Sequence, residues 1–202
     1  NGTLVRDFIP CQNASGAIGL WDAANEVFYG NAGTGTFTAG PVVPEIVDES
    51  EITELEYIQS GGTQYFKTGF FPTSKSRVVM EFEALTAGVD VGLCGARTSN
   101  SSKAFCFWFY TNYITSARFD YSKVNPITTA TPPSNERITL DMNQNTCVCD
   151  NFSETQPATT FQCDYDLSLF GINTAGTVGT STLFVGKLYN CQVYDEGLLE
   201  RD

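Results

Sequence analysis

The stretch that decides the fold is Arg77-Val78-Val79-Met80-Glu81-Phe82-Glu83-Ala84-Leu85. In it the apolar residues Val78, Met80 and Phe82 alternate with positions that include Glu81 and Glu83. Successive side chains of a strand point to opposite faces, so this alternation is typical of a half-buried antiparallel strand. We therefore expect the apolar residues to face a core and both carboxylates to lie outside.

Short apolar segments separated by turn residues recur on both sides of this strand. No long amphipathic helix is found between them, and this spacing is typical of sandwiches and barrels. The sequence predicts an all-β, two-sheet antiparallel jelly-roll sandwich. Residues 104–110 are almost wholly apolar and should form a central strand that is covered on both faces, and Asn143-Gln144-Asn145 should close a hairpin. The expected strands are 4–11 with a break at Pro10, 17–22, 26–29, 55–58, 64–68, 77–85, 91–96, 104–110, 117–121, 137–142, 146–149, 167–172 and 183–194.

Composition and charge exclude several classes of partner. The 202 residues have a net charge of −12, and such an acidic surface repels phosphate backbones and anionic membranes. We expect no nucleic-acid partner and no membrane insertion, because the chain has no apolar run of about 18 residues. It starts without Met or a signal peptide, so we expect a piece of a longer product.

Seven cysteines allow two states. Their odd number and scattered spacing fit buried thiols or, in an extracellular setting, one or more disulfides. Cys147 and Cys149 alternate on a predicted strand and should share a face. A structural zinc site would need four scattered thiolates, so we expect no metal site.

The two ends of the chain resemble each other. The segment 196–202 aligns with 1–7, with Gly, Leu, Arg and Asp at matching places. This divides the chain into three parts: 1–40, which reads as the closing strands of a fold; 41–52, an acidic connector with prolines; and 53–202, the core. The unit is then permuted, one period of a tandem array, or a subunit that completes its neighbour.

Several segments together resemble the bacterial and phage laminin-G-like domains of the concanavalin-A-like lectin/glucanase superfamily. The segments that carry the resemblance are Glu54–Gly69, Lys187–Asp195, Leu4–Cys11, Gly19–Asp22 and Phe28–Phe37. In that family the closing strands follow the penultimate strand, whereas here they come first. The resemblance implies a jelly roll, frequent tandem use, and surface, fibre or tail proteins that touch glycans. It implies no catalytic residue.

The displaced closing strands need a partner, because unpaired strand edges are sticky. The connector lets them fold back on their own core, or they complete a neighbouring copy and build a head-to-tail fibre. The duplicated ends favour the second route slightly. The expected assembly residues are Leu4, Val5, Phe8, Ile9 and Trp21, although Trp21 also fits a place in the core.

The sequence argues against an enzyme. It has no His, so Ser-His-Asp triads and His-ligated metals are excluded. Glu81 and Glu83 have the alternate spacing of glycosidase carboxylates, but the longer acidic pattern of glycosidases on this type of sandwich is absent, so solvated strand charge is the better interpretation. We expect no catalytic residue and no cofactor.

Sugar binding would use aromatic faces beside hydrogen-bonding side chains. The richest such cluster in the sequence is Trp108, Tyr110, Tyr113, Arg118 and Tyr121. Core packing is the better explanation for Trp108 or its alternate neighbours, and a glycan site on a concave face is the alternative. We therefore expect a non-enzymatic structural or adhesion module, assembled as a tandem array or strand-exchanged fibre, at the cell surface, outside the cell or in a virion appendage. The alternative is a lectin-like carbohydrate-binding module that recognises a receptor.

Overall fold

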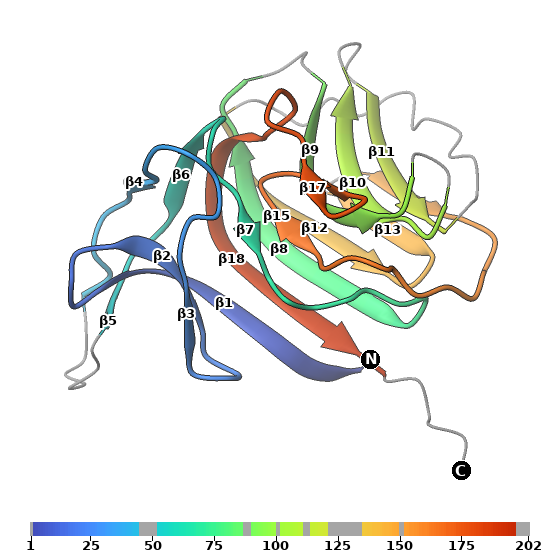
Figure 1. The fold of residues 1–202 in the computed structure, drawn as a ribbon, viewed down its shortest axis with the longest axis horizontal. Helices are drawn as coiled ribbons and strands as arrows, with labels where there is room; N and C mark the ends of the chain where they lie inside the picture. The colour runs from blue at the N-terminus through green and yellow to red at the C-terminus, as the bar shows by residue number, and fades with distance from the viewer. Residues whose placement is uncertain are drawn as a thin grey trace.

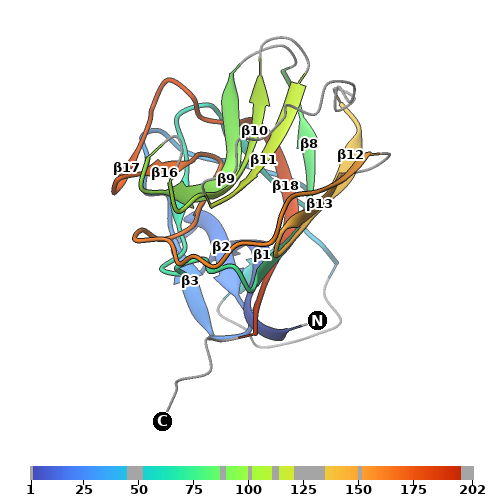
Figure 2. The ribbon, with the colours of Figure 1, turned by 90° about the vertical axis from the view of Figure 1, so that its right-hand side faces the viewer.

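The protein is an all-β sandwich, as the strand spacing predicts (Figure 1). This computed structural model describes residues 2–44, 52–86, 90–99, 102–110, 114–120, 135–149 and 152–196. No helix that could cross a membrane is found in these segments. Two sheets face each other across one core (Figure 2), which is the two-layer arrangement of a jelly-roll sandwich.

The larger sheet has eleven strands and contains both ends of the described chain. Its main order is β14-β13-β12-β8-β18-β1-β2-β3, with β4 and β5 added beside β6 and β1, and β6 beside β18. The strands are β1 (Thr3–Asn13), β2 (Ile18–Asp22), β3 (Val27–Tyr29), β4 (Thr38–Ala39), β5 (Ile52–Glu54), β6 (Ile58–Gly61), β8 (Ser76–Ala84), β12 (Arg137–Asn143), β13 (Thr146–Cys149), β14 (Phe152–Thr155) and β18 (Val185–Asp195).

The smaller sheet has seven strands in the main order β11-β10-β9-β15-β7. A short hairpin of β16 and β17 joins it through a parallel pairing of β16 with β9. The strands are β7 (Phe66–Lys67), β9 (Val91–Arg97), β10 (Phe105–Tyr110), β11 (Ile114–Phe119), β15 (Ser168–Leu169), β16 (Asn173–Thr174) and β17 (Thr177–Val178).

Strand β8 shows the alternation that its sequence predicts. Val78, Met80 and Phe82 are fully buried and belong to the single large core cluster between the sheets. In β10, Phe105 and Phe107 point into the same core, while Cys106 is buried on the opposite face of the sheet. The outer face of β10 is therefore covered at Cys106, whereas Trp108 on the same face is half-buried, so the prediction of cover on both faces holds only in part. The predicted hairpin of β12 and β13 is also present, with Asn143 paired to Thr146.

Strand β1 runs straight through Pro10, where the sequence predicts a break. The physical reason is a change of neighbour at this point. Phe8 is the last residue paired with β18, and Cys11 is the first paired with β5. Pro10 lies between these two ladders, and its carbonyl accepts a bond from the Leu55 amide. Its missing N–H therefore falls where β1 changes its neighbour, outside the paired registers with β18 and β5.

The closing strands fold onto their own core in this chain. β1 pairs with β18 on one side and with β2 on the other, so it is an interior strand of the larger sheet (Figure 1). Thr3 pairs with Asp195, which places the first and last strands side by side. That residues 1–40 are closing strands moved to the front of the fold stays a prediction. Exchange of these strands between copies stays a prediction, and residues 197–202 of the end repeat lie outside the described residues.

The core should depend on β1 as strongly as on the strands after residue 53. Phe8 is fully buried and packs edge-on against Tyr29 at 5.2 Å. We expect Phe8→Ala to lower the free energy of unfolding by about 3–5 kcal/mol, because it removes a buried ring and leaves a cavity. The matched control is Phe71→Ala, since Phe71 is 47% exposed and its loss should cost far less. Equal losses in urea denaturation would contradict this placement of β1.

Removal of residues 1–40 tests strand completion more broadly. The truncated chain would leave one edge of β18 open from Cys191 to Asp195, and it should not fold as a monomer. Adding a peptide of residues 1–40 should restore the folded state, which sedimentation and circular dichroism would report. A truncated chain that stays folded, monomeric and indifferent to the peptide would rule out both self-completion and donation as requirements for folding.

Candidate functional site

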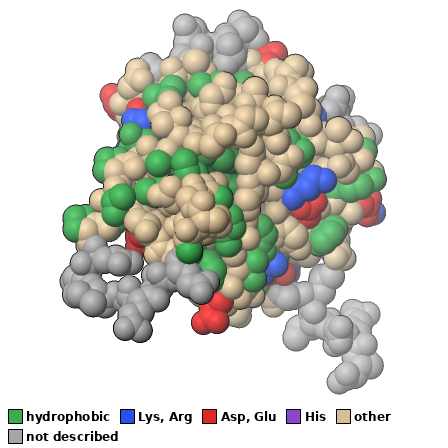
Figure 3. All heavy atoms as spheres, turned by 60° about the vertical axis from the view of Figure 1, so that its left-hand side comes forward, with side chains coloured by type: hydrophobic (Ala, Val, Ile, Leu, Met, Phe, Trp, Pro, Cys, Tyr) green, Lys and Arg blue, Asp and Glu red, His purple; other side chains and the backbone are tan. Residues whose placement is uncertain are grey.

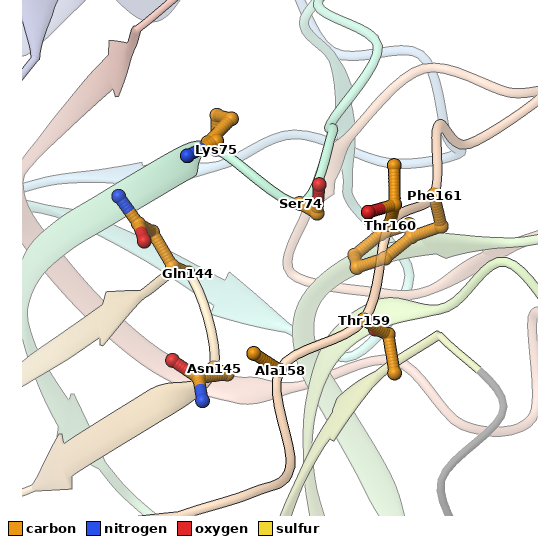
Figure 4. A pocket seen from close by; sticks show the side chains of 8 residues that line it. All are labelled: Ser74, Lys75, Gln144, Asn145, Ala158, Thr159, Thr160 and Phe161. Carbon is orange, nitrogen blue, oxygen red and sulfur yellow. The ribbon is translucent and has the colours of Figure 1, made fainter.

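A pocket opens at one rim of the sandwich, where three loops meet (Figure 4). It encloses about 200 Å³. One wall comes from the residues before β8, a second from the turn between β12 and β13, and a third from the segment that follows β14. Hydroxyl and amide side chains dominate its lining, which consists of Ser74, Lys75, Gln144, Asn145, Ala158, Thr159, Thr160 and Phe161.

Hydrogen bonds between the loops hold this pocket in shape. The Ser74 amide donates to the Phe161 carbonyl at 2.9 Å, which ties the first wall to the third. The Asn145 side-chain amide donates to the Gln156 carbonyl, and the Gln156 backbone amide donates to the Asn145 backbone carbonyl, so the second wall is tied to the third. Figure 4 shows Lys75 and Gln144 on one side of the hollow and Thr160 with Phe161 on the other. Donors and acceptors therefore converge on one space beside an aromatic ring.

Glu196 lies at the edge of this pocket. Its carboxylate is 3.8 Å from the Lys75 ammonium and accepts a bond from the Gln144 side chain at 3.3 Å. Both partners of this ion pair are well exposed, so water screens it strongly. The positive charge in the pocket is thus already balanced by the protein, which suits an uncharged polar ligand better than an anion.

The structure places Trp108 of the predicted sugar cluster on the outer face of the smaller sheet. Its ring packs against a small apolar cluster that includes Cys106 and Ile172, and it is half-buried. The Arg97 guanidinium lies over the ring, 5.1 Å from its centroid. The ring thus packs on a hydrophobic cluster and is still partly exposed, and its role in sugar binding stays a prediction. Sequence reasoning missed Arg97, whose position depends on the fold.

The other members of that cluster are described only in part. Tyr110 pairs with Ile114, and Arg118 pairs with Cys106 in the ladder between β10 and β11. Only the backbone of these two residues is described. Tyr113 and Tyr121 lie outside the described residues. The five residues therefore stay a prediction as a binding site, with Trp108 the one whose side chain can be placed.

The predicted assembly residues divide between core and surface. Phe8 belongs to the core and Val5 packs against it. Leu4 is 38% exposed, and Ile9 pairs with Trp21. The expectation that Trp21 joins the core is wrong, because its neighbours Leu20 and Asp22 take the inward positions. Trp21 instead pairs with Phe28 on the outer face, and all of Ile9, Trp21 and Phe28 are half-buried.

Among the described residues, the side of the molecule around β2, β3 and β4 shows few charged side chains. Figure 3 shows hydrophobic side chains scattered there among uncharged polar atoms. Val27 is 44% exposed and Val42 is 56% exposed. Single exposed apolar residues of this kind are ordinary on protein surfaces.

Glu81 and Glu83 of β8 have different environments. The prediction that both are solvated is wrong for Glu83. Glu81 is half-buried and forms an ion pair with Arg137. Glu83 also points away from the core, but it is buried at 8% exposure rather than solvated. Tyr189 donates a 2.7 Å hydrogen bond to it, and the Lys187 ammonium contacts both of its oxygens at 3.0 and 3.1 Å. Residues of β18 therefore cover Glu83, which its local pattern cannot reveal.

All seven cysteines are buried thiols, which confirms the first of the two expected states. Cys147 and Cys149 share the inward face while Val148 between them is exposed. Burial raises the pKa of the Cys11 thiol to about 12, with a smaller contribution from the charge of Glu54. It also raises the pKa values of Cys94 and Cys191. Protonated, enclosed thiols are poor nucleophiles.

Comparison with known proteins supports the fold. No family model and no curated protein matches the sequence. Among solved structures, a mutant of Trypanosoma rangeli sialidase that displays trans-sialidase activity is 11% identical, with a TM-score of 0.57 over 96% of this chain and 31% of that chain. Trypanosoma rangeli sialidase itself gives 13% identity and a TM-score of 0.55 over 97% and 31%. This chain thus spans about a third of their length.

A smaller structure is also similar. It is the CBM40 of the Ruminococcus gnavus IT-sialidase bound to alpha2,3 sialyllactose, which is 16% identical with a TM-score of 0.43 over 65% of this chain and 80% of that chain. Identities this low show at most a shared β-sandwich fold. The ligand and the activity of this chain must be argued from its own side chains.

The environment of Glu83 predicts a pH dependence. Desolvation raises its pKa, but the bonds from Tyr189 and Lys187 outweigh this and lower it below the ordinary value. A lowered folded-state pKa stabilises the protein above the unfolded pKa of about 4.3, and the gain is lost as pH falls through the folded value. Glu83→Gln should therefore cost stability at pH 7, and the difference should vanish in strong acid. Glu81→Gln, at a more exposed pair, should cost less in the same denaturation series.

Proposed function

We propose that this chain is a carbohydrate-binding module that uses the rim pocket to hold an uncharged part of a glycan. The main support for this proposal is the pocket itself. Hydroxyl and amide side chains from three loops line a cavity of about 200 Å³ beside the Phe161 ring. Sugars present many hydroxyl groups and an apolar face, and sites of this composition fit both. Loops on a rigid scaffold are also the usual place for binding residues.

We propose further that the module binds without catalysis. Hydrolysis of a glycosidic bond uses two carboxyl groups that flank it. No Asp or Glu is among the residues that line the pocket, and Glu196 at its edge is a single carboxylate paired with Lys75. Glu83 is held by Lys187 and Tyr189 in the covered outer face of β8, away from the pocket lining. The buried thiols with raised pKa values do not supply a nucleophile. These features favour recognition over chemistry.

A module of this kind fits a surface or appendage protein that touches glycans. The buried thiols favour folding in a compartment where thiols stay reduced, followed by release in an assembled particle such as a virion appendage. Assembly as a tandem array or strand-exchanged fibre is compatible with this role. In an exchanged fibre, β1 of one copy would pair with β18 of the next in the register seen here, Thr3 against Asp195.

Glycan binding at the pocket is tested by replacing one lining hydroxyl. A glycan array with the whole chain should give selective hits, whereas a purely structural unit should give none. Thr160→Val keeps the side-chain shape and removes one hydrogen bond, so we expect binding of a selected neutral oligosaccharide to weaken about tenfold. Titration calorimetry would measure this.

The matched control is Thr38→Val, since Thr38 is exposed on β4, which is not among the elements that form the pocket. It should bind as the parent chain does. If both valine variants bind equally well, the pocket is not the site. If the array shows no selective hit, the proposal of carbohydrate binding itself fails.

A further inference from the structure

Most basic side chains of this acidic protein are already matched with carboxylates. The ion-paired residues are Arg6, Lys75, Arg77, Lys103, Arg137 and Lys187. Among the basic side chains that the structure describes, only Lys67 and Arg97 form no ion pair. Lys67 donates to the Gly176 carbonyl. Arg97 is therefore a described guanidinium without a carboxylate partner, in a chain of net charge −12.

Arg97 is held in place by uncharged groups. Its Nε donates a 2.8 Å hydrogen bond to the Thr174 hydroxyl on β16, and its guanidinium carbon lies 5.1 Å from the centroid of the Trp108 ring. These contacts engage Nε and one face of the guanidinium. The carboxylate of Asp164, which accepts a bond from the neighbouring Thr98, is balanced by Lys103. The two terminal nitrogens of Arg97 thus keep their donors for another group.

Small side chains on the same face of the sheet make room for this arrangement. Ala104 lies just before β10 and Cys106 lies on it. Together with Ile172 they form a compact apolar cluster against which Trp108 packs. Gly92 allows Ile172 to approach, because a Cβ on Gly92 would come within 2.3 Å of it. Strands β9, β10 and β16 lie side by side (Figure 2). They present a fixed guanidinium beside an indole ring. By register, Arg118 is opposite Cys106 on the adjoining strand β11.

We propose that Arg97 and Trp108 form a second binding site, for the carboxylate or sulfate group of an acidic glycan. A guanidinium donates two parallel hydrogen bonds to such oxyanions, and stacking on an aromatic ring fixes its plane for this purpose. The exposed part of the Trp108 ring beside it can contact the apolar face of the sugar that bears the anion. The proposal extends the proposed carbohydrate binding but uses different residues from the rim pocket.

The net negative charge of the protein does not oppose this site at short range. Charges further than about 8 Å away are largely screened at physiological ionic strength. The negative charge of the protein repels an acidic glycan at long range. We therefore expect it to lower the association rate constant more than the affinity. Binding of an anion should be specific for this site, because few other basic side chains on the described surface lack a carboxylate partner.

Tryptophan fluorescence tests the site directly, because the chain has only two Trp residues. In a Trp21→Phe background, Trp108 is the single reporter. We expect a saturable change on titration with an oligosaccharide of uronic acids, and a clearly smaller one with its carboxyl-reduced, neutral counterpart. A sulfated oligosaccharide in a third titration separates sulfate from carboxylate recognition.

Three variants locate the response. Arg97→Gln should weaken binding of the acidic oligosaccharide at least about tenfold, and Arg97→Lys should restore only part of it, because a single ammonium cannot donate the parallel pair. Arg137→Gln removes the same charge from the other sheet and should leave the response unchanged. If Arg97→Gln proves unstable, the protein with Arg97 intact still tests the proposal, because its fluorescence response to the acidic oligosaccharide can be compared with that to the carboxyl-reduced one.

The outcomes separate this inference from the proposed function. Equal response to the acidic and reduced oligosaccharides, or undiminished acidic binding by folded Arg97→Gln, would overturn it. If a neutral glycan binds and Thr160→Val weakens that binding while Trp108 never responds to any anion, the pocket stands and the Arg97 site falls. If Trp108 reports Arg97-dependent acidic binding and no neutral glycan binds, the reverse holds.

Discussion

The pairing of β18 on both of its edges is the constraint on which the larger sheet depends. β8 covers one edge along its whole length, while β6 and β1 share the other. The first strand of the chain is therefore needed to finish the last one. With both edges satisfied, Leu188, Cys191 and Val193 close the core against the smaller sheet. An open edge at this central position would be a template for aggregation or exchange, which natural sheets avoid.

Polar groups on the outer face of this sheet form a self-contained network. The Arg137 guanidinium lies 4.1 Å from the centroid of the Tyr189 ring, and Lys187 lies 4.8 Å from that of Tyr57. Tyr189 and Lys187 in turn bond to Glu83. Cations and carboxylates here satisfy each other, so this face is suited to stability rather than to ligand binding. We expect ligand binding at places where polar side chains keep hydrogen-bond donors or acceptors that no protein group uses.

The two proposed binding places differ in construction. The rim pocket depends on loops that backbone hydrogen bonds hold together, and its donors are neutral apart from Lys75. The Arg97 site is carried by strands, so its guanidinium is fixed by the sheet itself. A glycan with both neutral and acidic units could use each place for the part it fits. Strand-borne groups are positioned more rigidly than loop-borne ones, which favours a charged contact that needs defined geometry.

The sequence by itself determined the fold class, most of the longer strands and the inward faces of β8 and β13, but not the short strands β4, β5, β14, β16 and β17. The alternation in β8 placed Val78, Met80 and Phe82 in the core, and Cys147 and Cys149 shared a buried face as their spacing required. These features are local, because a strand has a period of two wherever it lies. Only the tertiary structure decided the rest. It buried Glu83 under Tyr189 from β18, turned Trp21 outward, and tolerated Pro10 at a change of neighbours. It also brought Thr174 to Arg97 and gathered three loops into one pocket. Each of these depends on which distant segments become neighbours, and that is set by the packing of the whole chain and not by any local pattern.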